Sequence, residues 1–525
     1  MMATANEIKA APGVPEILAV IDIGSNAIRM VIAQFLPDGK LEVLERLQRA
    51  IRLGQDTFRT GQLRTETMRS AISILRDYQH LLNTYGVSRA RAVATSAVRE
   101  AANADTFIDR ILMATGIQVS VISVAEEGRL TVSAVRRAVG EKLLQEGDAL
   151  VVEVGGGSTI MNLLHDGEIA ASQSLPTGSV RMQEMLSTST EPADQATRLI
   201  KRQISSAIST LKGTLVLKNV QAFMAVGGDA RWAAAQVGKP LEGTNLRRVS
   251  REALEGLLGT CGSCTADELA RTYHLPFVEA ETITPALLVY QVLLKATGSK
   301  EMVVTDVSMR DGILADLMYS AAGQEAAHLY KEVIQSAQAV GQKYLTDMTH
   351  AQHIRLLAVR LFDELAAEHR LSDRHRLLLE VAALLHEIWT FVSSRAHHKH
   401  SYYLIANSEI LGLTQDELIM VANVARYHRH SRPKPTHPDY MTMSREARMI
   451  VNKLAAILRV ADALDVSRTQ SIRDLHCRID NNVGFVISVP AGLDLILERR
   501  SLAEKADMFQ EIYGLDVHLE EAGGP

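Results

Sequence analysis

Two short stretches of the sequence combine glycine with hydroxyl or amide residues, and each follows an acidic residue between two apolar runs. The acidic residues are Asp22 and Glu153. Turns of this composition can aim successive backbone N–H groups at one oxyanion, and glycine lets a ligand approach the backbone closely. A carboxylate at a strand end usually meets phosphates through a divalent cation. The matched turns therefore predict a phosphate site with Asp22 and Glu153 near the metal, although either turn alone would more often be a plain hairpin turn. The phosphate-binding candidates in the turns are Gly24, Ser25, Asn26, Gly155, Gly156, Gly157, Ser158 and Thr159.

Two further segments between these turns carry groups suited to phosphate chemistry. Residues 94–100 read as a strand end, then small hydroxyl residues, then Arg99 at the start of a helix. A helix N-terminus and a guanidinium both attract anions, although an ordinary helix cap with a solvated arginine would look the same. Glu126 and Glu127 begin another helix, where they could simply favour its dipole. The functional interpretation makes one of the two a general base for water.

The elements that must position these groups occur in two related sets. Both sets run from an apolar strand through an acidic residue and a glycine-rich turn into a second strand, which predicts two α/β halves with a cleft between them. The expected strands are 17–23, 27–35, 41–47, 90–95, 119–124, 149–154, 160–164 and one ending near 228, and the expected helices are 65–85, 97–114 and 125–139.

The character of the chain changes after about residue 320. Residues 325–470 show helical periodicity, and alternation typical of strands returns around 475–497 and 515–519. We therefore expect four domains: 1–130 and 131–320 as the two α/β lobes, 321–474 as an all-helical domain, and 475–525 as a small α+β domain.

Composition excludes several classes of protein. The chain has 525 residues, of which 47% are apolar and 22% charged, so the bulk of it should fold. A net charge of −5 gives no reason to expect DNA binding. Three cysteines cannot form a disulfide framework, the first 15 residues do not resemble a secretory signal, and no long uncharged apolar run suggests a membrane span. We expect a soluble cytoplasmic protein.

Taken together and in this order, the motifs resemble the exopolyphosphatase / guanosine pentaphosphate phosphohydrolase family, over about residues 17–318. The motifs are DIGSN at 22–26, ATSAVRE at 94–100, EEGRL at 126–130, GGGST at 155–159, SLPTGSVR at 174–181, GG at 227–228 and SMRDGIL at 308–314. The resemblance implies two actin-like (ribonuclease H-like) lobes. It also implies removal of a terminal phosphoryl group with Mg²⁺ or another divalent cation. By position it makes Glu127 the base and Arg99 a phosphate ligand, and it implies a homodimer.

Two positions depart from the family pattern. Glu153 stands where the family usually has aspartate, and Ile160 stands where it commonly has an acidic residue. These changes could alter the affinity or the position of the metal. Asp22 and Glu153 remain, and Mg²⁺ generally needs only one or two protein carboxylates beside substrate oxygens.

The helical region carries its own histidines and acids, including His353, His386, Glu387 and Asp462. Its sequence resembles the HD-type phosphohydrolase superfamily, in which such residues hold metals, but Glu387 replaces the paired aspartate. A helical scaffold that has lost its metal is the preferred alternative. A local basic concentration could guide a polyanion to the cleft; its residues are His398, His400, Arg426, His428 and Arg429.

The leading hypothesis is an exopolyphosphatase acting on inorganic polyphosphate, without DNA or membrane partners. Guanosine pentaphosphate 5′-phosphohydrolase activity is the close alternative, because the same site would serve both. A kinase or ATPase of the same fold, and a non-catalytic protein that senses nucleotide or polyphosphate, remain as other classes.

Overall fold

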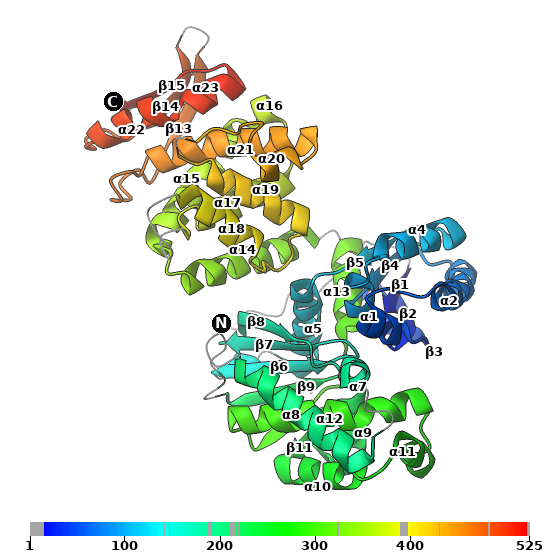
Figure 1. Cartoon of the computed structure of the whole chain (residues 1–525). Coiled ribbons are helices and arrows are strands. Elements are labelled where there is room, and N and C mark those ends of the chain that lie inside the picture. The colour runs from blue at the N-terminus through cyan, green and yellow to red at the C-terminus, as the bar shows by residue number, and fades with distance from the viewer. Residues whose placement is uncertain are drawn as a thin grey trace. The chain divides into compact units, whose positions relative to one another are not determined.

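A computed structural model of the chain describes residues 15–521 apart from 141, 146, 187–190, 211–216, 218–219, 323–324, 389–396, 430 and 481–482. The chain forms two compact units that meet in sequence between residues 328 and 329. The first unit holds two mixed sheets with their helices, and the second is mainly helical (Figure 1).

The first sheet has the strand order β3-β2-β1-β4-β5. Its strands are β1 (Glu16–Ile23), β2 (Ala27–Phe35), β3 (Leu41–Ala50), β4 (Arg89–Ala94) and β5 (Val119–Val121). The first three form an antiparallel meander, and β4 and β5 join β1 in parallel. β1 and β2 are almost wholly buried because both of their faces are covered, which explains their continuous apolar runs.

Helices cover both faces of this sheet. The helices of the segment are α1 (Leu53–Thr60), α2 (Thr65–Thr84), α3 (Ser96–Arg99) and α4 (Ala104–Thr115). α2 and α4 pack on one face, and α13 (Met309–Ala321) packs on the other. The expected single helix 97–114 is wrong, because the chain breaks between α3 and α4. There the side chain of Asn103 exchanges two hydrogen bonds of 2.9 Å with the backbone of Leu63.

The second sheet repeats the plan of the first with additional strands, in the order β10-β11-β12-β9-β6-β7-β8. Its strands are β6 (Asp148–Val154), β7 (Thr159–His165), β8 (Glu168–Leu175), β9 (Ala222–Val226), β10 (Lys239–Pro240), β11 (Arg247–Ser250) and β12 (Glu301–Val304). β6, β7 and β8 form an antiparallel meander, and β9 pairs with β6 in parallel. The predicted pair of related α/β halves is thus present.

The helices of this second half are α5 (Val124–Val139), α6 (Lys142–Gln145), α7 (Ser179–Leu186), α8 (Ala193–Ser209), α9 (Gly228–Val237), α10 (Arg251–Cys261), α11 (Ala266–Tyr273) and α12 (Phe277–Thr297). Among the described helices, α12 alone is long and apolar enough to cross a membrane. Ile283, Leu287 and Tyr290 of α12 lie in the core of the second sheet, so its apolar character is that of a core helix.

Two helices cross where the two halves meet, α5 from the second half and α13 from the end of the first unit. The crossing is close, since a Cβ on Gly312 of α13 would lie 2.0 Å from the carbonyl oxygen of Leu130 on α5. Beside it, the buried guanidinium of Arg129 binds Glu126 on its own helix and Asp316 on α13. Arg91 of β4 binds the same two carboxylates. An ionic network thus fixes α5 against α13 and the first sheet.

The second unit contains the helices α14 (Glu325–Lys343), α15 (Met348–Glu364), α16 (Ala366–His369), α17 (Asp373–Leu385), α18 (His397–Ala406), α19 (Gln415–Arg426), α20 (Pro438–Met441), α21 (Arg445–Ala463), α22 (Ile496–Lys505) and α23 (Asp507–Tyr513). Its small sheet has the order β13-β14-β15, from β13 (His476–Asp480), β14 (Gly484–Val489) and β15 (Val517–Glu521). Phe485 and Leu519 of this sheet share one hydrophobic core with the preceding helices. The described residues of 475–521 therefore share a core with the helices, and whether they form the separate small domain expected from the sequence stays a prediction.

We expect Gly312→Ala to destabilise the first unit by about 1–3 kcal/mol, because the added methyl group overlaps the Leu130 carbonyl and forces α5 and α13 apart. The matched control is Gly256→Ala in α10, where a Cβ meets no atom within 4 Å. There the gain in helix propensity should stabilise by about 0.5–1 kcal/mol. Urea unfolding of both variants measures the two effects, and equal midpoints would contradict the close crossing.

Candidate active site

A cavity of about 710 Å³ in the first unit is lined by both glycine-rich turns. The first turn joins β1 to β2, and the second joins β6 to β7. Nine of the predicted site residues line this cavity, namely Asp22, Gly24, Ser25, Asn26, Glu127, Glu153, Gly155, Gly156 and Ser158. The structure therefore brings the two turns, which are more than 100 residues apart in the sequence, to the same cavity.

The two turns have the same local geometry. The amide of Gly24 donates to the carbonyl of Ala27 at 3.1 Å, and the amide of Gly155 donates to the carbonyl of Ser158 at 2.9 Å. The intervening amides of Ser25, Gly156 and others in the turns donate to no residue that the structure describes. Each turn thus keeps N–H groups available for an anion, as a phosphate-binding turn requires.

The remaining three phosphate-site candidates, Arg99, Gly157 and Thr159, are not among the residues that line the cavity. Thr159 is fully buried, and its hydroxyl is bonded to Thr177. Gly157 packs so closely that a Cβ would lie 2.2 Å from the Ser96 hydroxyl oxygen, and its carbonyl accepts a hydrogen bond from Arg181. Arg99 binds the carboxylate of Glu127 instead of facing the cavity. These residues hold the turn and the base in place.

Glu127 lies in the first turn of α5, after the cap formed by Ser123. Arg99 donates to its carboxylate at 3.2 Å and to the carbonyl of Ile122 at 2.8 Å, so the guanidinium ties the base to the strand end before it. Burial raises the pKa of Glu127 to about 7; the charge of Arg99 opposes this shift, and the carboxylates of Glu153 and Asp22 reinforce it. A carboxylate with this pKa is suited to accept a proton near neutral pH.

Glu126 has a different role, although it is adjacent in sequence. Burial alone would raise its pKa, but hydrogen bonds and charge from Arg129 and Arg91 outweigh burial and lower it. Its carboxylate belongs to the network at the crossing of α5 and α13. The structure thus separates the two glutamates, one facing the cavity and one joining the helices.

Asp22 and Glu153 lie at matched strand positions and both line the cavity. Asp22 accepts a hydrogen bond from Arg310 at 2.8 Å, and Glu153 accepts one from the hydroxyl of Thr131. Ile160 stands directly opposite Glu153 in the β6–β7 pair, and it is fully buried and offers no ligand atom. Burial raises the pKa of Glu153, and Asp22 adds repulsion. A divalent cation between these carboxylates would relieve that repulsion, so the residues present fit such an ion.

Sequence reasoning assigned no site role to three cavity arginines, which are Arg29, Arg231 and, inside the motif at 308–314, Arg310. Burial lowers the pKa of Arg29 and of Arg231. Arg29 could have been found from the sequence, because it is a charged residue inside the apolar strand β2 and lies directly opposite Asp22. The other two lie in the first turns of helices α9 and α13. Many surface arginines lie at such positions, so their place in the sequence did not mark them as cavity residues. Asp229 was missed as well; burial raises its pKa to about 6, and Thr282 donates to its carboxylate at 2.9 Å.

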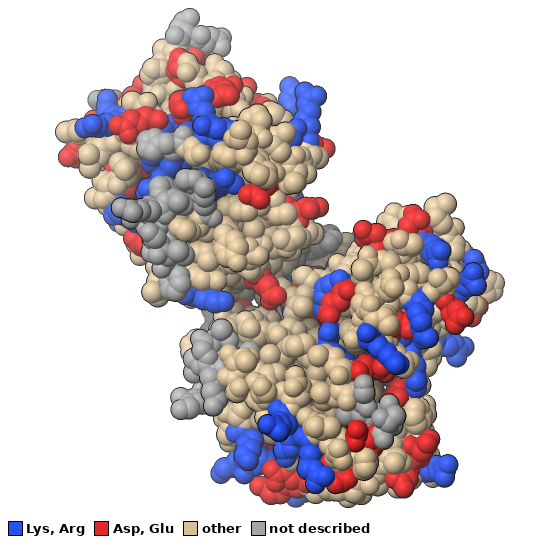
Figure 2. All heavy atoms as spheres, viewed as in Figure 1, with Lys and Arg blue, Asp and Glu red and all other residues tan. Residues whose placement is uncertain are grey.

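Among the residues expected to guide a polyanion, those whose side chains the structure describes are largely buried or paired. In the second unit Arg426 and His428 are buried, and Arg426 pairs with Asp439 at 3.3 Å. His400 is half-buried and Arg429 lies 3.7 Å from Glu387, while the side chain of His398 falls outside the described residues. On the face seen in Figure 2, basic and acidic groups are intermingled.

Comparison with known proteins decides the family. The Ppx/GppA phosphatase family matches residues 31–321, more than half of the chain, and domain III of the Ppx/GppA phosphatases matches residues 334–506. The chain belongs to the Ppx/GppA phosphatase family. The resemblance drawn from the motifs is thereby confirmed, and the first match ends where α13 ends. The HD-like character of the second unit stays a prediction.

The chain is also similar to several individual proteins. A guanosine-5′-triphosphate,3′-diphosphate pyrophosphatase of Aeromonas hydrophila is 25% identical over 485 residues, covering 90% of this chain and 92% of the relative. The solved exopolyphosphatase of Cytophaga hutchinsonii is 21% identical, covers 58% of this chain and 98% of its own, and has a TM-score of 0.52, which shows the shared fold. The Aquifex aeolicus family member is 25% identical, with 58% and 99% coverage and a TM-score of 0.48.

The two adjacent glutamates should respond oppositely to loss of charge. Glu126→Gln removes the charge of one of the two carboxylates that bind the buried Arg129 and should destabilise by about 1.5–3 kcal/mol. Glu127→Gln should stabilise at pH 8 by roughly 1–3 kcal/mol, because one pKa unit corresponds to about 1.4 kcal/mol.

The pH dependence follows from the raised pKa of Glu127. The folded chain holds this proton up to about pH 7, whereas the unfolded chain releases it near 4.5. Protonated Glu127 therefore makes its full contribution to the free energy of unfolding below pH 4.5, and this contribution is lost as the pH rises through 7. The advantage of Glu127→Gln should be absent at pH 4.5 and largest above 7 in urea unfolding; a constant difference would contradict the raised pKa.

Proposed function

We propose that this protein is an exopolyphosphatase that hydrolyses the terminal phosphoanhydride bond of inorganic polyphosphate, with Glu127 as the general base. The observation that carries the proposal is the position of Glu127, whose pKa is raised to about 7, in the cavity that both glycine-rich turns line. Phosphoryl transfer needs positioning and charge stabilisation more than covalent chemistry, and this cavity offers both.

Each part of the cavity has a role in the proposed reaction. The free amides of the two turns and the guanidinium groups of Arg29, Arg231 and Arg310 hold the phosphate oxygens. Glu127 takes a proton from a water molecule as its oxygen forms a bond to the terminal phosphorus. The bond from that phosphorus to the bridging oxygen breaks, and the shortened chain leaves with the electron pair. Arg99 keeps the Glu127 carboxylate oriented while it accepts the proton.

Asp22 and Glu153 are the residues that would hold a divalent cation, such as Mg²⁺. When bound, the ion would neutralise charge on the phosphate oxygens. Ile160 removes one ligand that the family commonly supplies, so we expect the ion to depend more on substrate oxygens than on the protein.

Substitution of Glu127 by glutamine should lower kcat for phosphate release from long polyphosphate, assayed with Mg²⁺, by at least about 100-fold. The reason is that general-base catalysis typically raises a reaction rate by roughly 10²–10⁴-fold. The exposed Glu66→Gln serves as the control and should leave the rate unchanged. Since Glu127→Gln is expected to be stabilised, lost activity cannot be attributed to unfolding. Equal rates in the parent and Glu127→Gln would remove Glu127 as the base.

Guanosine pentaphosphate is a second candidate substrate, favoured by the apolar flank of the same cavity. This flank consists of Trp232, Leu275, Pro276, Val278 and Ile283. Tyr273 packs edge-on against Trp232, with ring centroids 5.0 Å apart, and so fixes the indole. An aromatic wall beside a phosphate site is suited to a nucleobase, and the Aeromonas relative carries the name of an enzyme for this nucleotide.

If the nucleotide is the substrate, Trp232→Ala should lower kcat/KM for guanosine pentaphosphate about tenfold or more and leave polyphosphate hydrolysis unchanged, since base stacking contributes about 1–3 kcal/mol. Trp232→Phe keeps an aromatic face and should retain most of the activity. Parallel assays with both substrates decide the matter. An equal loss on both would mean that Trp232 supports the cavity without contacting a base.

A further inference from the structure

Thr131 is a fully buried residue of α5 whose hydroxyl is used outside its own helix. Threonine inside a helix commonly donates to the carbonyl four residues earlier. Thr297 of α12 does so, with a bond of 3.0 Å to the carbonyl of Leu293. The hydroxyl of Thr131 instead donates to Oε2 of Glu153 on β6. The contact therefore points to a role in the cavity, which Glu153 lines.

A glycine three residues earlier brings α5 close enough for this contact. A Cβ on Gly128 would lie 2.7 Å from Oδ1 of Asn162 on β7, so even a methyl group would overlap that side chain. Gly128 and Thr131 face the same side of the helix, because residues three apart are neighbours on its surface. β7 pairs with β6, and its Ile160 lies directly opposite Glu153. The helix therefore lies near enough to these strands for a side chain as short as threonine to reach Glu153.

The two carboxylates expected near the cation are held in the same way. Arg310 donates to Oδ2 of Asp22 at 2.8 Å, and Thr131 donates to Oε2 of Glu153. Oδ1 of Asp22 and Oε1 of Glu153 make no hydrogen bond to any residue that the structure describes. Each side chain is thus fixed through one oxygen and keeps the other for a ligand.

The two donors come from the crossing helices α5 and α13 (Figure 1). Arg310 lies two residues before Gly312, and Thr131 directly follows Leu130. Gly312 and Leu130 are in close contact where the helices cross. A change in the crossing would therefore move both donors, and with them both carboxylates.

We propose that Thr131 is a positioning residue, whose hydroxyl holds one oxygen of Glu153 so that the other faces the cavity and binds the divalent cation. This inference rests on the proposed function, because it takes Glu153 as a residue that holds the cation. Hydrogen-bonded partners that orient a metal ligand typically change metal affinity by roughly 10–100-fold. A neutral hydroxyl fixes the carboxylate without forming an ion pair, so the negative charge that attracts the cation is kept.

The length of the side chain at position 153 separates this role from a general contribution to the fold. Aspartate there would be one methylene, about 1.5 Å, shorter, and the Thr131 hydroxyl would no longer reach its carboxylate. The effect of Thr131→Val should therefore appear with glutamate at position 153 and vanish with aspartate. A double-mutant cycle measures this dependence.

Mn²⁺ binding to the metal-free, full-length chain tests the proposal in the absence of substrate. The EPR signal of free Mn²⁺ measures binding, and the part that Glu153→Gln abolishes defines the cavity site. We expect Thr131→Val to weaken binding at this site by about 10–100-fold, whereas Thr131→Ser, which keeps the hydroxyl, should bind like the parent. In the Glu153→Asp background, Thr131→Val should weaken binding no further. Unchanged binding in Thr131→Val, or an equal loss in both backgrounds, overturns the proposal.

Two controls separate this role from stability and from the proposed reaction. Thr297→Val removes a buried hydroxyl bond within α12 and should leave Mn²⁺ binding unchanged. If urea unfolding shows that Thr131→Val does not fold, Thr131→Ala takes its place with the same expectation. Phosphate release from polyphosphate is measured on the same proteins, and Thr131→Val should raise the Mg²⁺ concentration that gives half the maximal rate. A parent that binds Mn²⁺ through Glu153 but releases no phosphate would contradict the proposed function, while the coupling between Thr131 and Glu153 would still support the positioning role.

Discussion

The buried guanidinium of Arg129 is the contact on which the arrangement of the first unit depends. It binds Glu126 on its own helix and Asp316 on the helix that crosses it, and Arg91 bridges the same carboxylates from the first sheet. A charge buried this deeply is tolerated only with its partners in place. The network therefore fixes the angle at which α5 enters the cavity, and with it the position of Glu127 one residue from Glu126. The absence of a side chain at Gly312 allows the helices the close approach that this network needs.

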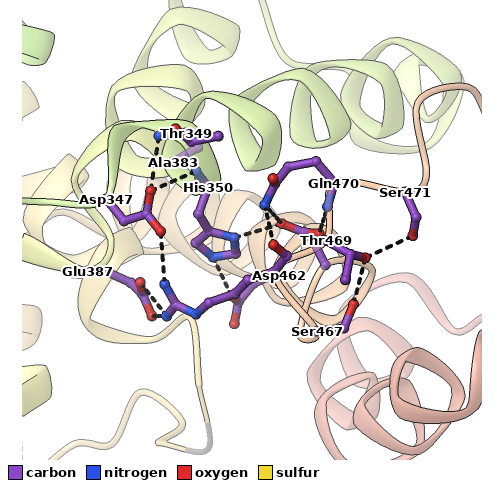
Figure 3. A network of polar contacts seen from close by, with 12 residues as sticks. Asp347, Thr349, His350, Ala383, Glu387, Asp462, Ser467, Thr469, Gln470 and Ser471 are labelled. Carbon is purple, nitrogen blue, oxygen red and sulfur yellow. Dashed lines mark hydrogen bonds and ion pairs between the residues drawn. The ribbon is translucent and has the colours of Figure 1, made fainter.

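The cavity itself gathers like charges where burial makes them unfavourable. Asp22, Glu127 and Glu153 repel one another, and burial raises the pKa of the two glutamates. Opposing charge comes from Arg99 and Arg310, which bind one carboxylate each. Such clusters of perturbed groups are typical of functional sites, because a group tuned for proton transfer is rarely the one that best stabilises the fold. The second unit shows the same feature in its buried histidines, such as His350 beside Asp462 (Figure 3).

The order of apolar, acidic and glycine residues along the chain was sufficient to predict much of the fold and part of the site. The strand–turn–strand repeats around residues 22–28 and 153–160 predicted paired halves, and both turns line one cavity. The break at Asn103 was not predictable, because the bonds that hold it come from Leu63, 40 residues away. The same limit applies to Arg310, whose role depends on Asp22. Arg426 and His428 looked like surface charges in sequence, and only the packing of the helices shows that they are buried.

The bond between Asp22 and Arg310 joins positions 288 residues apart. Helix α13 also supplies Ile313 and Leu314 to the core beneath β1, so one face of the first-formed sheet has no cover until the ribosome has made more than 300 residues. Contacts of such long range slow folding and leave apolar surface open in the meantime. We therefore expect nascent chains of this protein to rely on chaperones during synthesis, and fragments that stop before α13 to aggregate rather than to fold as a lone lobe.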